Sequence, residues 1–255
     1  QADCIYVNDA GCFAKALAAR DAGAKGKLIF NVLDVPEHCF QPLGDYTHDK
    51  LLDLRDALVC ADAVTAISPF TRSQLQRLLG LTATVIWNPV KDVSPAKRLA
   101  GERPYPFSAL CAGRTRDKNK RIDTIGIPAL IMAGFEENEV AICGGEWTGW
   151  GTDMGIVSDY TLNDLYNSVD FVMHPSALEG LGLGPLEAMI CGAIPILTYD
   201  MSTFGDMSFY PQYWGCYPSA TSVAYRLRSL MDNPGMFIAE REHCLLQSPI
   251  IAERF

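Results

Sequence analysis

The chain has 255 residues, of which 49% are apolar, and its 30 acidic side chains outnumber the 21 basic ones, so the formal charge is −9. This composition excludes a disordered chain and predicts one or two packed domains. The acidic balance argues against general nucleic-acid binding, because phosphate backbones are bound by Lys and Arg, but it is compatible with one local basic pocket.

Short apolar runs alternate with amphipathic stretches along the chain. In the first part, strands are expected over residues 2–7, 27–33, 63–68 and 84–88, and helices over 10–22, 48–60 and 69–79. After residue 106, strands are expected over 107–113, 139–145, 170–175 and 193–199, and helices over 122–134, 161–168, 185–191 and 219–232. Apolar strands separated by helices are typical of parallel sheets covered on both faces.

The helix over 161–168 carries its own signals. Thr161 followed by Asp164 resembles a capping box with a shorter acid, which predicts Thr161 as the N-cap. The apolar residues Leu162, Leu165, Tyr166 and Val169 then repeat on one helical face.

A proline-rich segment divides the chain. The stretch NPVKDVSPAKRLAGERPYP carries four prolines, mixed charges and no apolar period. Such a segment is typical of a linker between two α/β units. We predict a small unit over residues 1–92, a linker over 93–106 and a larger unit over 107–255.

A glycine-rich stretch follows the expected strand over 170–175. It runs from Glu179 to Glu187 with glycines at 180, 182 and 184, directly before the expected helix over 185–191. Glycines let backbone N–H groups approach a ligand, and a helix N-terminus attracts an anion such as phosphate. The two flanking carboxylates suit hydrogen bonds from sugar hydroxyls. The alternative is an ordinary turn with solvated acids.

A basic loop follows the expected strand over 107–113. Five of the eight residues in this loop are basic: Arg114, Arg116, Lys118, Lys120 and Arg121. Open α/β sheets bind ligands at the carboxyl ends of their strands, and Arg and Lys both bind phosphate there. A solvated loop is the alternative. Together with the glycine-rich stretch, the basic loop suits a nucleotide diphosphate joined to a sugar, and its cations can neutralise a leaving diphosphate without a metal.

These stretches resemble a known family. The run HPSALEGLGLGPLEAMICGAIPIL resembles the nucleotide-sugar motif of family 4 retaining glycosyltransferases, which have the GT-B fold, and CAGRTRDKNKRID is similar to that family's GR…K segment. The resemblance covers about residues 60–255. It implies two Rossmann-like α/β units with parallel sheets, the N-terminal one (1–92) being truncated and on the acceptor side. The unit over 107–255 would bind the nucleotide sugar.

The resemblance also implies roles for single residues. Arg114 and Lys120 would bind the diphosphate, and Glu179 would contact the transferred sugar; these three form the expected catalytic set. Glu187 would hold the ribose hydroxyls. His38 is a candidate contact to the sugar, with a surface or capping histidine as the alternative. Further donor contacts are expected from Lys118, Gly180, Leu181, Gly182, Leu183 and Gly184, and near the base from Gly155 and Ile156.

The implied reaction is transfer of a hexose-type sugar from a UDP- or GDP-linked donor, with retention of configuration and with neither metal nor cofactor. The acceptor, whether a glycan, a lipid or another molecule, stays open. One alternative is a non-catalytic nucleotide-sugar-binding subunit. Another is a glycosyltransferase of modified DNA bases, which the acidic balance disfavours. A glycosidase pair is disfavoured because the spacing of Glu179 and Glu187 does not place them on opposite sides of a sugar.

Cysteine usage and hydropathy indicate the compartment. The nine cysteines form no CxxC pair and lie mostly in apolar runs, which favours reduced thiols in a cytoplasmic protein. No transmembrane segment is expected, and peripheral attachment to a membrane is left open.

Overall fold

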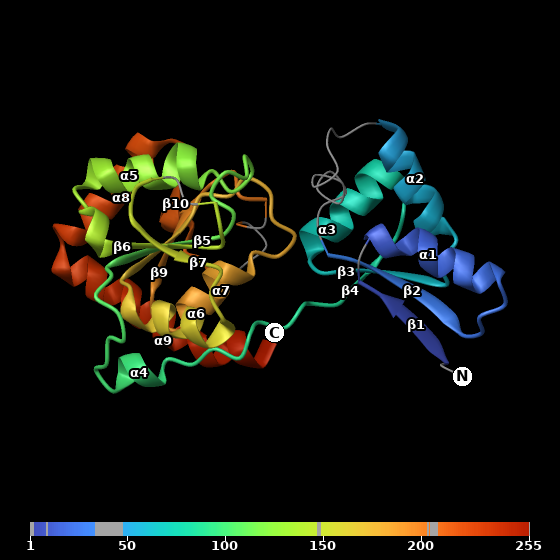
Figure 1. Ribbon diagram of the computed structural model, residues 1–255, viewed down its shortest axis with the longest axis horizontal. Coiled ribbons are helices and arrows are strands. Elements are labelled where there is room, and N and C mark those ends of the chain that lie inside the picture. The colour runs from blue at the N-terminus through green and yellow to red at the C-terminus, as the bar shows by residue number, and fades with distance from the viewer. Residues whose placement is uncertain are drawn as a thin grey trace. The chain divides into compact units, whose positions relative to one another are not determined.

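The structure is a computed structural model that describes residues 3–8, 10–33, 48–146, 149–202, 204 and 209–254 (Figure 1). These residues form two compact units. The first comprises Gln1–Asn88 together with Leu178–Leu181, and the second comprises Pro89–Ala177 together with Gly182–Phe255.

The described part of the first unit contains a parallel sheet whose strands pair in chain order. Its strands are β1 (Cys4–Val7), β2 (Lys27–Val32), β3 (Ala63–Ala66) and β4 (Thr84–Val85), and its helices are α1 (Ala10–Asp21), α2 (His48–Val59) and α3 (Pro69–Gln74), which a π-helical segment (Leu75–Leu79) extends. When every crossover is right-handed and each new strand is added on the same side of the previous one, all the connecting helices lie on one face of the sheet. Figure 1 shows α1, α2 and α3 on the same side of the sheet.

The core of the first unit forms between β2 and its helices. Phe30 of β2 stacks on Phe13 of α1, with ring centroids 4.2 Å apart. Leu28 and Val32 point to the same face of the strand as Phe30, and all three side chains are buried. The apolar run that predicted this strand is therefore the run that packs against α1.

The second unit contains a parallel sheet in the order β10-β9-β8-β5-β6-β7. Its strands are β5 (Ala109–Ala112), β6 (Val140–Cys143), β7 (Thr152–Gly155), β8 (Phe171–His174), β9 (Ile194–Thr198) and β10 (Gly215–Cys216). The main helices are α5 (Ile127–Ala133), which continues a π-helical segment (Ile122–Gly126), α6 (Asp159–Ser168), α7 (Leu183–Ile190), α8 (Ala220–Met231) and α9 (Pro234–Arg254). In Figure 1, α5 and α8 lie on one face of the sheet, and α6, α7 and α9 lie on the other.

Strand β5 marks the point where the chain changes direction across this sheet. From β5 the chain moves outward through β6 and β7, and it then returns to β8 on the other side of β5. This is the strand order of a Rossmann fold, in which ligands bind outside the carboxyl ends of the strands at the switch point. The predicted α/β class with two parallel-sheet units is confirmed, and the switch point lies between the strands that precede the basic loop and the glycine-rich stretch.

Several elements differ from the expectations. Strands β7 and β10 and the long helix α9 were not predicted. The segment of β7, TDMG, lacks an apolar run, and α9 contains Pro249, which predicts a helix end rather than a helix interior. The prediction of Thr161 as the N-cap of α6 is wrong, because Ser158 Oγ accepts the backbone N–H of Thr161 at 3.1 Å and the helix begins at Asp159.

Candidate functional site

The loops that follow β5, β8 and β9 are joined at the carboxyl edge of the second sheet. The backbone N–H of Ala177 donates to the carbonyl of Asn119 at 3.0 Å. Arg121 donates from Nε to the carbonyl of Pro175 at 2.6 Å, and its guanidinium forms an ion pair with Asp200 at 2.7 Å. Burial alone would raise the pKa of Asp200, but the hydrogen bonds and charge of Arg121 outweigh burial and lower it. Arg121 therefore holds three loops together.

The other cations of the basic loop are less buried than Arg121 or equally half-buried. Arg114 is 62% exposed and is held by Asp117 of the same loop through an ion pair of 2.7 Å. The side chain of Lys118 is exposed, and that of Lys120 is half-buried. Two of the predicted phosphate ligands, Arg114 and Lys118, thus present charge to solvent beside the switch point.

The ends of β5, β6 and β7 approach one another closely at glycines. The N–H of Gly113 donates to the carbonyl of Cys143 at 2.8 Å, and the N–H of Gly144 donates to that of Gly155 at 2.9 Å. A Cβ at Gly144 would lie 2.6 Å from the Gly113 carbonyl oxygen. Ile156, which follows Gly155, is 89% exposed. Gly155 and Ile156, the residues predicted to lie near the base, therefore place an exposed apolar side chain at the end of β7.

Helix α7 begins at the glycine-rich stretch, two residues before the expected start. Gly182 occupies the N-cap position with φ 76° and ψ 57°, a left-handed conformation that favours glycine. Leu183 and Gly184 form the start of the first turn, where N–H groups have no partner within the helix. This end of α7 is an anion-attracting position that follows β8.

Glu187 lies one turn into α7 and is only 3% exposed. The hydroxyl of Tyr166 on α6 donates to its Oε2 at 3.1 Å. Burial raises the pKa of Glu187, while Tyr166 and Lys91 partly oppose that rise. Lys91 Nζ itself pairs with Asp159 at 2.5 Å. Sequence reasoning placed Tyr166 on an apolar helical face and missed the role of its hydroxyl.

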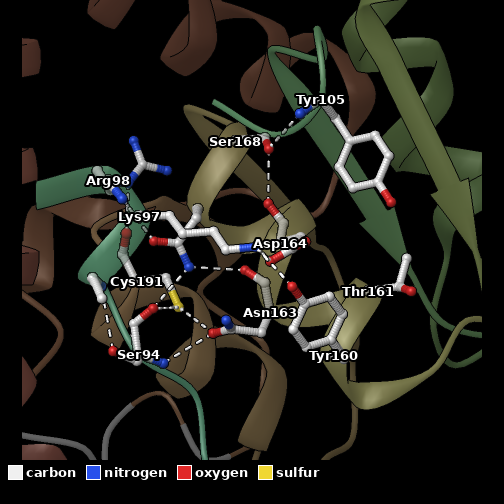
Figure 2. Close-up of polar contacts among 12 residues, drawn as sticks. Ser94, Lys97, Arg98, Tyr105, Tyr160, Thr161, Asn163, Asp164, Ser168 and Cys191 are labelled. Atoms are coloured by element: carbon white, nitrogen blue, oxygen red, sulfur yellow. Dashed lines mark hydrogen bonds and ion pairs between the residues drawn. The ribbon is translucent and has the colours of Figure 1, made fainter. Parts of the chain in front are cut away.

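Figure 2 shows that the proline-rich segment contacts the second unit through Ser94, Lys97, Arg98 and Tyr105. Lys97 pairs with Asp164 at 2.5 Å and lies over the ring of Tyr160. The N–H of Ser94 donates to Asn163 Oδ1 at 2.9 Å. These contacts fasten the segment to α6.

Arg98 in the short helix α4 (Ala96–Leu99) completes this attachment. Its guanidinium donates to the carbonyls of Tyr166 and Val169 at the end of α6, and to the carbonyl of Cys191 at the end of α7. Burial, together with the nearby Arg241, lowers the pKa of Arg98 to about 10, so Arg98 stays charged at neutral pH. One cation thus satisfies the unpaired carbonyls of two helix C-termini.

The remaining predicted site residues lie elsewhere. Glu179, Gly180 and Leu181 belong with the first unit, where Thr71 Oγ1 of α3 donates to the Gly180 carbonyl at 3.3 Å. His38 lies outside the described residues. The residues that the structure brings to one edge of the second sheet are Arg114, Lys118, Lys120, Gly155, Ile156, Gly182, Leu183 and Gly184, with Glu187 one turn further along α7.

Within the described ranges, no group of three or more His, Cys, Asp or Glu side chains is arranged to hold a metal ion. None of the helices described is both long and apolar enough to cross a bilayer.

Two parallel α/β units, the second with Rossmann strand order, define a GT-B-like fold, and solved structures agree with this class. Sucrose-phosphate synthase from Thermosynechococcus elongatus matches with a TM-score of 0.73 and 19% identity over 98% of this chain and 71% of that one. HepE of Anabaena, solved with UDP and glucose, matches with a TM-score of 0.73 and 16% identity over 99% and 74%. The trehalose-6-phosphate synthase OtsA matches with a TM-score of 0.68 and 12% identity over 98% and 69%. Comparisons with protein-family models and with curated proteins gave no match.

Proposed function

We propose that this chain is a nucleotide-sugar glycosyltransferase, of the retaining hexosyltransferase type, that needs neither a metal nor a cofactor. The observation that carries the proposal is the junction of the basic loop after β5 with the loop after β8, which leads to the N-terminus of α7, at the switch point of the second sheet. Cationic side chains and a helix N-terminus together favour a diphosphate. The similarity to sucrose-phosphate synthase and to HepE, solved with UDP-glucose, supports the proposal.

In this reaction, five of the predicted residues contact different parts of the donor. Arg114 and Lys120 bind the diphosphate, and they neutralise its growing charge as its bond to the sugar breaks. The acceptor oxygen forms the new bond to the sugar, and its proton passes to the departing diphosphate. Glu187 accepts the ribose hydroxyls, and Glu179 contacts the transferred sugar. Ile156 offers an apolar surface to the base.

The direct test is a panel of UDP-, GDP- and ADP-sugars. We expect one nucleotide to raise the melting temperature in a concentration-dependent way, because a ligand that binds only the folded state stabilises it. Sugar release or transfer from that donor should then persist in EDTA. Loss of activity on chelation, restored by Mn²⁺ or Mg²⁺, would refute the metal-independent reaction. If the chain binds the donor but neither hydrolyses it nor transfers its sugar to any acceptor class, the chain is a nucleotide-sugar-binding subunit and not an enzyme.

Removing the basic loop's charges should weaken donor binding. Because a hydrogen bond to a charged group contributes about 1.5–3 kcal/mol, Arg114→Ala and Lys120→Ala should each lower nucleotide diphosphate affinity by roughly one to two orders of magnitude. Calorimetric titration measures this. Lys15→Ala, an exposed cation on α1, is the control and should bind like the wild type. Unchanged affinity in both loop variants would contradict the assignment.

The two carboxylates should respond differently to removal. Glu187→Ala should mainly lose donor affinity, because its partners are the ribose hydroxyls. Glu179→Ala should mainly lose turnover, since its partner is the reacting sugar, and small displacements there cost about 10²-fold. Donor titrations measured beside transfer rates separate the two effects. If both variants lose affinity and turnover in the same proportion, the roles assigned to Glu187 and Glu179 are wrong.

A further inference from the structure

We propose that Tyr166 is a positioning residue, which holds the Glu187 carboxylate so that its remaining acceptor sites face the two ribose hydroxyls of the donor, and that the positive charge of Lys91 keeps this carboxylate ionised. The inference rests on the proposed function, and it adds two residues that neither the motif nor the basic loop contains. Both residues lie in the second unit with Glu187.

The hydrogen-bond count of Glu187 is the first argument. An ionised carboxylate offers about four acceptor sites. The Tyr166 hydroxyl takes one at Oε2, at 3.1 Å. The sites that remain are enough to accept both donors of a vicinal diol.

The position of the Tyr166 hydroxyl is the second argument. A Cβ built at Gly184 would lie 3.8 Å from this hydroxyl oxygen, so Tyr166 lies against the first turn of α7. Gly184 and Glu187 are three residues apart and share one helical face. The tyrosine therefore contacts the face of α7 that connects the anion-attracting turn to the carboxylate. Tyr166 is buried and Glu187 is 3% exposed, so both side chains are enclosed by the surrounding packing.

The charge around Glu187 is the third argument. A buried carboxylate becomes protonated unless donors and cations oppose the cost of burial, and a protonated carboxyl offers fewer acceptor sites. Lys91 supplies a nearby positive charge, which favours the ionised carboxylate, while Asp159 acts in the opposite sense. The proline-rich segment, fixed by Ser94, Lys97 and Arg98, keeps Lys91 in this place.

The test compares UDP, GDP and ADP with their 2′,3′-dideoxy counterparts by calorimetric titration of the full chain. Tyr166→Phe should weaken the ribonucleotide that binds by about ten-fold, which corresponds to one modest hydrogen bond, but should weaken its dideoxy counterpart by less than about two-fold. Lys91→Met, at an exposed side chain, should show the same selectivity with a smaller loss. The matched control is Tyr160→Phe, whose ring is 70% exposed and whose hydroxyl contacts Lys97. It should bind both nucleotides like the wild type.

The outcomes separate this inference from the proposed function. If the wild type binds none of the three diphosphates, the proposed function and the inference both fail. If it binds one of them but Tyr166→Phe weakens the ribo and dideoxy forms equally, or weakens neither, the inference alone is overturned. Should Tyr166→Phe fail to fold, as judged by circular dichroism, Lys91→Met decides by the same comparison.

Discussion

Replacing Arg98 with Met is expected to destabilise the second unit by about 3 kcal/mol, because hydrogen bonds to a charged group are worth about 1.5–3 kcal/mol each and buried carbonyls would lose their partner. The carbonyls of Tyr166, Val169 and Cys191 all depend on this guanidinium. Urea unfolding followed by circular dichroism measures the change.

The control for this prediction is Arg103→Met. Arg103 pairs with Asp170 at 2.7 Å, but its side chain is about half exposed, so its loss should cost less than about 1 kcal/mol. Equal destabilisation by the two substitutions would show that the helix ends do not depend on Arg98.

Replacing Gly144 with Ala is expected to destabilise the second unit by about 3 kcal/mol, since it combines a left-handed backbone with overpacking. The new Cβ would lie 2.6–2.9 Å from backbone atoms of Gly113, which cannot move aside as a flexible side chain can. The displaced start of the basic loop should also weaken binding of the nucleotide diphosphate. Thermal unfolding and the titration with nucleotide measure the two effects.

The neighbouring residue provides a matched control. Gly145 also has a left-handed φ, 87°, but a Cβ there would meet no atom within 4 Å. Gly145→Ala should therefore cost only the backbone strain, about 1 kcal/mol. If both alanines destabilise the protein equally, close packing of the β5 and β6 ends is not what requires Gly144.

Local patterns in the sequence were enough to predict the strands and loops that build the site. The apolar runs of β5, β8 and β9, and the residue types of the loops after β5 and β8, placed a basic loop and a glycine-rich turn on one sheet edge. The strand order places β5 beside β8, so the two loops are neighbours at the same edge of the sheet, as the sequence predicted. The individual roles of Glu179 and Glu187 remain predictions.

Contacts between distant segments were beyond the reach of the sequence. Arg98 stands in a stretch without apolar period, and its partners lie about 70 to 90 residues further along the chain. Tyr166 fits an apolar helical face, which hides the fact that its hydroxyl has a carboxylate partner. Arg121 looked like one more phosphate ligand, yet its contacts with Pro175 and Asp200 make it a brace between loops.

Arg98 also changes the electric field around α7. A helix carries about half a positive charge at its N-terminus and half a negative charge at its C-terminus, and Arg98 compensates the negative end at Cys191. The positive pole lies at the buried Gly182, on the same sheet edge as the exposed cations Arg114 and Lys118. In a chain of charge −9, this edge is a local region of positive potential that attracts anions over about one Debye length. The rate at which a diphosphate arrives at this edge should therefore fall as ionic strength rises, while an uncharged sugar gains no such advantage.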